Sequence, residues 1–514
     1  MDYLMAIDLG STSLKAVIYD LDGNRIASAS RPTEKITPDG HPEWVIWEPD
    51  QIWHGAAAAS KEALSAIESS SLVKAVAVTG MGMDGVPIDK HGHHLYPFIS
   101  WHDPRTASQA EWWDKHVGAQ KTFEIAGFPT WAITAAMRIL WMTEHEPEIM
   151  KKADKWLLIE DFVNHKLCAK IVTDYSMASC MLLFDQKAQT WSDELLSASG
   201  IDRTLLPDPA QSGTVLGKVT AEASALTGLS TDTTVVLGGH DHICGTLPIG
   251  VYKPGRLLDI IGTWEIISTA VPSPVLNPAI SAAGICMQSH VVKNMYSAWG
   301  AAVSGESLEW FRKEFGFEAE QKAGKDGSVV WKHLLQWLAD TKPGASGAMF
   351  LPHVSAAGCP VNDNKSLGAF VGVSNTVTKG DMLRAVIEGL NYQFLHIIEV
   401  MEASLNCKLD KITISGGVAQ NEFWIQNKVD MLGLPMEVSE IQDATPFGCA
   451  MLAGVGVGLY KDIDEAYDRV KKSGKQYQPN KDLTKQYAKL FKIHKAIYPA
   501  LKHINHTIFD TFKG

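Results

Sequence analysis

The sequence has few cysteines, and their arrangement excludes two kinds of architecture. Seven cysteines occur in 514 residues, an odd number, and none stands in a Cys-x-x-Cys pair. Disulfide frameworks and structural zinc sites use paired, closely spaced cysteines. We therefore expect the cysteines to be small buried side chains in a protein of a reducing compartment.

Long hydrophobic runs are also missing. The longest apolar stretches, such as "AMLAGVGVGLY" at residues 450–460, are shorter than the roughly 18 residues that a membrane-spanning helix needs. No basic and then apolar leader precedes "MDYLMAIDLG". These features predict a soluble, cytoplasmic protein without a membrane partner.

The chain has no excess of positive charge. Its formal net charge is −12 at pH 7, whereas a nucleic-acid partner requires a basic face. Residues 468–495 are rich in Lys, but Tyr, Leu, Phe and Ile recur among them at helical spacing. This pattern favours the solvated face of packed helices over nucleic-acid binding.

What the chain does have is enough length and apolar content, 46%, for two domains. "YLMAIDLGSTSLKAVIY" near the start and "PGRLLDIIGTWEIISTAV" from residue 254 share one layout, a strand, a short turn and a strand. We expect a duplicated architecture with a cleft between the halves. Because Pro and Gly cluster in "PIGVYKPG", the predicted domains are residues 1–249 and 250–514.

Between these landmarks the pattern predicts further elements. "KAVAVTG" and "KITISGG" are typical of buried strands, and "NEFWIQNKVDMLG" of the helix that follows the second one. We expect helices over residues 48–67, 136–153 and 155–167.

The first candidate site is the turn in "AIDLGSTSLK". A strand brings Asp8 to its end, Gly10 allows a tight turn, and Lys15 begins the returning strand. Small donors and a cation suit phosphate oxygens, and a carboxylate suits hydrated Mg²⁺. The hydroxyl donors of this turn are Ser11, Thr12 and Ser13. An ordinary polar hairpin turn is the alternative.

Two later turns also end strands. "IIGTWE" offers Gly262 and Thr263, while Gly416 and Gly417 in "ISGGVAQNEFW" would let a flat ring or a ribose approach the backbone. Asn421 stands where a helix N-cap belongs, so capping is its simplest role. Three such turns in this order indicate a nucleotide site more strongly than any one of them.

The most unusual stretch is "GGHDHICG" at residues 238–245, where Asp241 stands between His240 and His242. The three side chains could bind a metal, or Asp241 could act alone. Consecutive residues of an extended chain point to opposite sides, which argues against three ligands converging on one ion.

These motifs resemble the FGGY carbohydrate kinases of the actin-like superfamily. The C-terminal family signature is matched throughout by "GAFVGVSNTVTKGDMLRAVIE" at residues 368–388. The N-terminal signature is matched in part by residues 133–145, with Arg138 in place of Lys and Ala135 in place of Ser, Thr or Pro. The resemblance implies an α/β fold of two actin-like (ribonuclease H-like) domains, with mixed β-sheets flanked by helices and an active-site cleft between them.

The resemblance also implies roles for the residues of the motifs. Asp241 would be the general base that receives the proton of the attacking hydroxyl, and Asp8 would hold the Mg²⁺ of ATP. The residues implied to bind the phosphates and the adenosine are Ser11, Thr12, Ser13, Lys15, Gly262, Thr263, Gly416, Gly417, Gln420 and Asn421. "DATPFGCAMLAG" departs from the family pattern at Ala444 and Pro446, so nucleotide contacts there are less well defined.

The substrate side is implied to include Met83, Asp84, Trp101 and His242. Asp84 could accept two sugar hydroxyls, or it could cap a turn. Trp101 could stack on a sugar, or it could be a core residue. L-Fuculokinases have a sequence similar to the stretch "VPIDKHGHHLYPFISWHDPRT". An L-fuculose-like deoxyketose is therefore the first substrate hypothesis.

Other activities stay open at this stage. The family alternatives are kinases of D-xylulose, of D-ribulose, or of a polyol such as erythritol or glycerol. A catalytically idle sugar sensor and an actin-like ATPase that acts on a protein partner are alternatives of a different class. The resemblance further suggests a homodimer, because relatives are often dimers.

Overall fold

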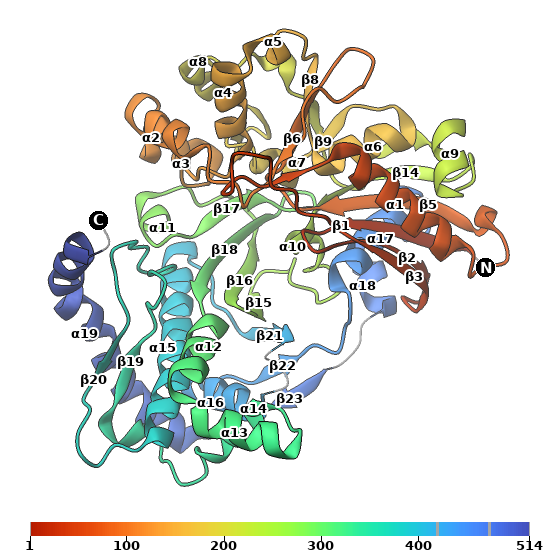
Figure 1. Cartoon of the computed structure of the whole chain (residues 1–514). Coiled ribbons are helices and arrows are strands. Elements are labelled where there is room, and N and C mark those ends of the chain that lie inside the picture. The colour runs from red at the N-terminus through yellow and green to blue at the C-terminus, as the bar shows by residue number, and fades with distance from the viewer. Residues whose placement is uncertain (1, 418–420, 471–473, 513–514) are drawn as a thin grey trace.

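The structure is a computed structural model, and it describes residues 2–417, 421–470 and 474–512. Two lobes are visible in Figure 1, each built on a large β-sheet with helices against it. The N-terminal part of the chain forms the upper lobe in this view, and most of the C-terminal part forms the lower one. The expected two-domain α/β fold is confirmed.

The first sheet contains six strands within the described residues, in the order β13-β14-β5-β1-β2-β3. Their bounds are β1 Tyr3–Leu9, β2 Ser13–Asp20, β3 Arg25–Pro32, β5 Val73–Gly80, β13 Val215–Lys218 and β14 Thr234–His240.

The second sheet contains seven strands in the described part of the chain, in the order β17-β18-β16-β15-β21-β22-β23. Their bounds are β15 Arg256–Ile261, β16 Trp264–Val271, β17 Cys286–Ser289, β18 Tyr296–Val303, β21 Lys411–Ser415, β22 Met436–Val438 and β23 Lys475–Tyr477.

Both sheets have the same core connectivity, which confirms the expected duplication. In the first, β1 pairs antiparallel with β2 and parallel with β5, and β5 pairs parallel with β14. In the second, β15 pairs antiparallel with β16 and parallel with β21, and β21 pairs parallel with β22. The first turn (residues 10–12) and the second turn (residues 262–263) therefore occupy equivalent places.

The strands β1, β5 and β14 are largely buried because both faces of the first sheet are covered there. Alternate residues of β1 enter different hydrophobic clusters: Met5 and Ile7 lie in one, while Leu4 and Ala6 lie in the other. The first cluster packs under α1 (Pro49–Leu64), α6 (Ile159–Cys168) and α9 (Ala221–Thr227). The second packs under α10 (Asp241–Cys244), α17 (Ala444–Gly456) and α18 (Ile463–Val470).

The position of α17 and α18 qualifies the division of the chain at residues 249 and 250. The two large sheets do separate near this point, since β14 ends at His240 and β15 begins at Arg256. However, Phe447 and Tyr467 belong to the hydrophobic cluster of the first sheet. The chain therefore returns from the second half to complete the core of the first.

The second sheet has one thickly covered face. Its main helices are α12 (Gly305–Phe315), α15 (Lys379–Leu405), α16 (Glu422–Leu432) and α19 (Lys481–Phe512). Thr378 and Asp381 form a capping box at the start of α15, which gives the matched family signature a structural reason. The Lys-rich stretch contributes to α19, which buries Tyr487 and His494 and exposes most of its lysines, as predicted.

The expected helix at residues 155–167 is only partly correct. Its first residues form β8 (Lys155–Leu158), which pairs with β6 (Gly85–Ile88), and α6 begins at Ile159. A short apolar run is compatible with either a strand or a helix, and pairing with β6 decides between them here. The helix expected over residues 136–153 ends early because Pro147 starts a new helix.

The remaining elements surround the two sheets. The short strands are β4 Ile46–Trp47, β7 Phe98–Ile99, β9 Val172–Asp174, β10 Phe184–Asp185, β11 Thr190–Trp191, β12 Asp208–Ala210, β19 Met349–Leu351 and β20 Ala369–Val371. The other α-helices are α2 Ala107–His116, α3 Ala119–Ala126, α4 Ala135–His145, α5 Pro147–Met150, α7 Tyr175–Ser179, α8 Asp193–Ser199, α11 Pro278–Ala282, α13 Phe317–Asp326 and α14 Val330–Gln336.

Two expectations from composition can be compared with the fold. The seven cysteines are all free thiols in the described chain, and only Cys407 is not buried. Within the described ranges, every helix falls short of the length and apolar content that crossing a bilayer would require.

Candidate active site

Asp241 lies where β14 ends and the short helix α10 begins. Its side chain is 33% exposed, and the backbone N–H of His242 donates to its Oδ1 at 2.5 Å. His240 is buried beside it, with Nε2 at 3.5 Å from the same oxygen. The chain therefore presents one partly exposed carboxylate at the end of a buried strand.

The expectation that these three residues lie on an extended chain was wrong. Because the helix begins at Asp241, one ligand atom from each of His240, Asp241 and His242 lies within 4.8 Å of the others. The distances alone would therefore permit a shared metal ion. Whether the histidines offer free lone pairs depends on their hydrogen bonds.

The electrostatic surroundings keep Asp241 ionised. Burial raises the pKa of its carboxyl, but the hydrogen bonds from His242 and the electrostatic effect of the two histidines outweigh burial and lower it overall. Burial, together with His242, lowers the pKa of His240 to about 3, so its imidazole is neutral at pH 7. A carboxylate beside a neutral ring can orient a hydroxyl and accept its proton.

Asp8 and Lys15 face each other across the β1–β2 ladder. Lys15 Nζ lies 2.8 Å from Oδ1 of Asp443, and Arg25 binds the other oxygen of Asp443 at 3.0 Å. Asp443, which sequence reasoning missed as a site residue, precedes α17 in a left-handed conformation with φ of 52°. In the sequence, Asp443 is marked only by its place at the start of the "DATPFG" stretch. It lies 428 residues from Lys15 along the chain.

The surroundings of Asp8 fit a divalent cation. Burial, with the carboxylates of Asp241 and Asp443, raises the pKa of Asp8 to about 7 against the opposing effect of Lys15. The three carboxylates outnumber the two cations beside them, Lys15 and Arg25. Oxygen ligands of this kind suit Mg²⁺, so the residues present fit the ion that the sequence predicted.

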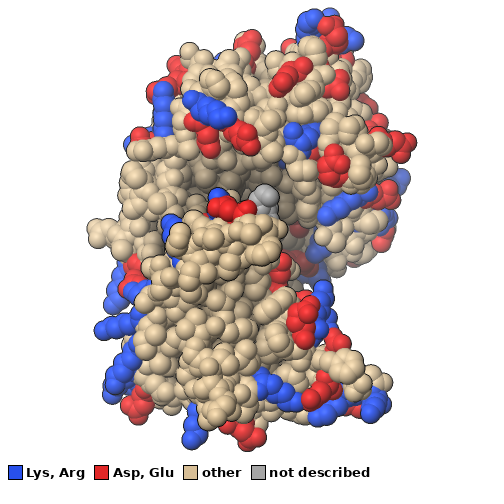
Figure 2. Space-filling view, turned by 60° about the vertical axis from the view of Figure 1, so that its left-hand side comes forward, with Lys and Arg blue, Asp and Glu red and all other residues tan. Residues whose placement is uncertain are grey.

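These charged groups open into a cavity between the two lobes. Asp8, Lys15, His242 and Asp443 line it from one side, together with Leu258, Ile260 and Ser415 from the second sheet. Figure 2 shows the hollow that separates the two lobes on the surface. The candidate metal ligand Asp8, Lys15 and His242, the residue next to the candidate base, thus line one space.

A second, larger pocket lies against the second turn. Gly262, Thr263, Gly417 and Asn421 line it, together with apolar side chains of α12, α14 and α16. These apolar residues are Leu308, Trp331, Leu335 and Trp424, with Val329 just before α14. Apolar walls with exposed backbone at one end suit a purine and its phosphate tail.

Gly416, Asn421 and Gln420 were also predicted to bind the adenosine. Gly416 has φ of 101°, and a Cβ there would meet the carbonyl oxygen of Ile261 at 2.4 Å, so glycine is required. Asn421 caps α16 through its Oδ1, which accepts from the N–H of Trp424 at 3.2 Å, and it also lines the pocket. Gln420 lies outside the described residues.

Asp84 does not lie open to the cleft. It is 0% exposed, and its two oxygens are engaged by Trp47 Nε1 at 2.6 Å and by Arg138 at 3.4 Å. Burial raises its pKa to about 6, against the opposing effects of Arg138 and Trp47. A sugar could bind this carboxylate only by displacing one of these partners, so the arrangement does not support direct recognition of two hydroxyls. Met83 beside it is a core residue.

Trp101 is 37% exposed and stacks on His102, with ring centroids 3.7 Å apart. The core-packing alternative for this residue was therefore wrong. Asp103 and Arg105, which follow, form a bidentate ion pair, with bonds of 2.8 and 2.6 Å. The pair fixes the loop that carries Trp101.

Sequence reasoning also missed an aromatic wall beside His242. The ring of His242 meets Trp299 edge-on at 5.2 Å, and Trp299 in turn contacts Trp131 and Phe128. Trp299 comes from β18 of the second sheet, whereas Trp131 precedes α4 of the first half. No local pattern in the sequence marks residues so far apart as neighbours.

Comparison with known proteins identifies the family. Residues 3–248 match the N-terminal domain of the FGGY family of carbohydrate kinases, and residues 258–457 match its C-terminal domain. The chain belongs to this family. The protein is therefore an ATP-dependent phosphotransferase that acts on an alcohol group of a carbohydrate-type substrate.

Relatives of this FGGY kinase differ in their named substrates. A xylulose kinase of Staphylococcus epidermidis is 28% identical over 507 residues, 98% of each chain. An L-fuculokinase of Escherichia coli K12 is 27% identical over 481 residues, 93% of this chain and 97% of that one. The solved structure of a xylulose kinase from Rhodospirillum rubrum is 26% identical, with a TM-score of 0.88, and covers 98% of this chain and 100% of its own.

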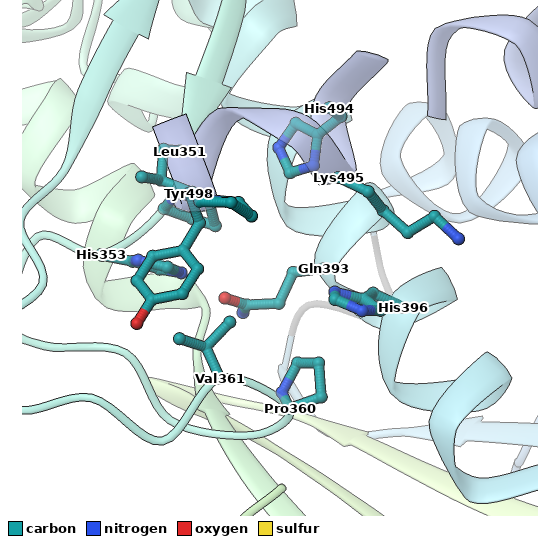
Figure 3. Close-up of a pocket in the computed structure, with 11 residues that line it drawn as sticks. Leu351, His353, Pro360, Val361, Gln393, His396, His494, Lys495 and Tyr498 are labelled. Atoms are coloured by element: carbon teal, nitrogen blue, oxygen red, sulfur yellow. The ribbon is translucent and has the colours of Figure 1, made fainter. Parts of the chain in front are cut away.

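Another pocket of this FGGY kinase lies in the lower lobe between α15, α19 and the loop before β20 (Figure 3). Burial lowers the pKa of both His353 and His494 to about 4, so these imidazoles are neutral. Lys495, the lysine on its rim, is paired with Glu399 at 2.5 Å. None of the predicted site residues lines this pocket, and its neutral lining does not suit a nucleotide phosphate.

Proposed function

We propose that this FGGY kinase transfers the γ-phosphate of MgATP to a primary hydroxyl of a ketose or polyol of about four to six carbons, with Asp241 as the general base. The observation that supports this most directly is a cavity that is lined by Asp8, Lys15 and His242, the residue next to Asp241. The base, a cation site and a phosphate-binding lysine are the parts that phosphoryl transfer needs in one place.

The proposed reaction moves the γ-phosphoryl group from ATP to the acceptor oxygen. The acceptor oxygen attacks the γ-phosphorus, the bond to the bridging oxygen of ADP breaks, and the hydroxyl proton passes to Asp241. Because the transition state is loose, the protein contributes mainly positioning and charge stabilisation. Lys15 and the backbone of the second turn would hold the phosphates, and Mg²⁺ held by Asp8 would neutralise their charge when bound.

For the acceptor we infer an L-fuculose-like deoxyketose as the first candidate. The aromatic wall of Trp299, Trp131 and Phe128 beside His242 offers an apolar surface that suits a methyl group. One extra methyl in an apolar pocket changes specificity by about 10–200-fold. D-Xylulose fits the relatives equally well, and D-ribulose, glycerol and erythritol are further alternatives.

A coupled assay of ADP release over a panel of these acceptors tests the proposal. We expect sugar-dependent ADP release, with the highest kcat/KM for the ketose that carries a methyl group. Absence of acceptor-dependent release at millimolar concentrations would contradict the kinase assignment. ATP hydrolysis that does not depend on any sugar would instead favour the actin-like ATPase.

The homodimer stays a prediction from the family resemblance, and the cytoplasmic location stays a prediction from the sequence. Light scattering coupled to gel filtration distinguishes a monomer from a dimer directly.

A further inference from the structure

A chain of side chains connects the second sheet to the candidate base. Trp299 Nε1 lies 3.2 Å from Oε1 of Gln288, and Nε2 of Gln288 lies 2.8 Å from Nδ1 of His240. Nε2 of His240 lies 3.5 Å from Oδ1 of Asp241. Gln288 is 0% exposed and His240 is 7% exposed, so water has little access to these contacts.

The orientation of the Gln288 amide is fixed by two partners that cannot exchange roles. An indole N–H only donates, so the amide atom that faces Trp299 must be the oxygen. The backbone oxygen of Ser176 only accepts, so the amide atom 2.7 Å from it must be the NH₂ group. The same NH₂ group is the one that contacts His240.

This orientation decides which nitrogen of His240 carries the proton. Because Gln288 donates to Nδ1, that nitrogen must be the acceptor of a neutral imidazole, and the proton resides on Nε2. His240 therefore directs an N–H toward the carboxylate of Asp241. Its backbone N–H donates to Ser176 Oγ at 2.9 Å, which holds the residue from a second side.

The same tautomer bears on the possible metal site. Nε2 of His240 has no free lone pair while Nδ1 accepts from Gln288, so it cannot be a ligand without loss of that hydrogen bond. The distances within the cluster of His240, Asp241 and His242 would thus suit a metal ion, but one of the three ligand atoms has no free lone pair.

We propose that Gln288 is a positioning residue that locks the tautomer of His240 and thereby holds the Asp241 carboxylate ready for catalysis. The inference rests on the proposed role of Asp241 as the base. Gln288 and Trp299 belong to the second sheet, whereas His240 and Asp241 belong to the first half. The orientation of the base therefore depends on contact between the two halves of the molecule.

The test compares Gln288→Met with the wild type and with a matched control. Methionine has a similar size and cannot donate to His240. The control is Gln186→Met, because Gln186 is equally buried and donates to Ala126 O and Ser179 Oγ rather than to His240. Selective ¹⁵N labelling of histidine, with assignment by a His240→Gln variant, reports the tautomer by NMR.

In the wild type we expect the Nε2–H tautomer of His240, and in Gln288→Met we expect its loss. We expect kcat to fall by about 10–100-fold in Gln288→Met, as for partners that orient a functional group, while KM for ATP is unchanged. Gln186→Met should keep both the tautomer and kcat. A wild-type Nδ1–H tautomer, or an unchanged kcat when the tautomer is lost, would overturn the proposal.

The NMR result does not require the enzyme to be active, so it separates the two hypotheses. If the tautomer is as stated but no acceptor supports ADP release, the proposed function fails, whereas the effect of Gln288 on the tautomer of His240 still holds. If ADP release is found but the wild-type tautomer is Nδ1–H, only the role of Gln288 fails.

Discussion

The first and second turns occupy equivalent places in two sheets of the same strand order, yet their cleft-facing side chains differ completely. In the first sheet the second residue pair of the ladder, counted from the turn, is Asp8 and Lys15. In the second sheet the corresponding pair is Ile260 and Ile266. One copy of the architecture presents charges to the cleft and the other presents an apolar surface. The duplicated halves therefore differ in the charge of the surface that they present beside the turn.

The second half keeps its charges on the opposite face of its sheet. Lys428 lies 2.6 Å from Asp259 and 2.6 Å from Glu265, and the three side chains are at most 1% exposed. Glu265 also accepts a hydrogen bond from Ser304 at 3.0 Å. This group connects the strand after the second turn to α16, so its expected role is structural.

The largest predicted effect is on the catalytic side of the comparison. Asp241→Asn removes the proton acceptor while it keeps the shape of the side chain. We expect kcat to fall by about 10²–10⁴-fold with ATP affinity unchanged, measured by coupled ADP release and by ATP titration. Retention of most of the turnover would remove Asp241 from the role of base.

The next prediction concerns the buried charges of the second half. Lys428→Met leaves two buried carboxylates without a cation, so we expect a loss of about 3–5 kcal/mol in the free energy of unfolding. Urea unfolding followed by circular dichroism measures this loss.

The matched control neutralises the whole group. The triple variant Lys428→Met, Asp259→Asn, Glu265→Gln should recover part of the lost stability, because no uncompensated charge remains. An unfolding midpoint of Lys428→Met equal to that of the wild type would show that the buried group is not a structural element.

Lys15→Met tests the charged pair of the first turn. Loss of a cation aimed at the transferred phosphate should lower kcat by about 10²–10³-fold. Steady-state kinetics with saturating sugar measures the effect. Lys74→Met serves as the control, because Lys74 is a partly exposed lysine that pairs with Asp2 instead of a cleft residue. Equal kinetics for the two variants would argue against a phosphate-binding role of Lys15.

The smallest predicted effect is at Trp101. If its ring stacks on the sugar, Trp101→Ala should raise KM for the sugar by about 2- to 12-fold with KM for ATP unchanged, since an aromatic contact contributes about 0.5–1.5 kcal/mol. Trp112→Ala is the matched control, because Trp112 is also 37% exposed and also stacks on a histidine, His116. An unchanged KM for the sugar would place Trp101 outside the acceptor site.

Much of the fold could be predicted because its signals are local. Each turn after a buried strand carries its own glycine and small polar residues, and the two copies of the pattern predict the duplication. The helix at residues 155–167 was partly wrong because only pairing with β6 makes Lys155–Leu158 a strand. Such pairing is not encoded within the segment itself.

The site was harder to predict where it depends on contacts between distant residues. Asp443 pairs with Lys15 across 428 positions, and Gln288 reaches His240 from another sheet. Asp84 was expected to bind a sugar or to cap a turn, whereas its hydrogen bond from Trp47 depends on how β4 lies in the fold. Side-chain partners of this kind follow from the packing of the lobes, which the sequence pattern does not specify.

The central claim is that an acceptor hydroxyl lies between the Asp241 carboxylate and the γ-phosphate of ATP. The most direct test is a crystal structure with a non-hydrolysable ATP analogue and the best acceptor from the panel. We predict a primary hydroxyl within hydrogen-bond distance of Asp241 and facing the γ-phosphorus, with Lys15 released from Asp443 toward the phosphates. An acceptor bound elsewhere, with Asp241 facing away from it, would contradict the account.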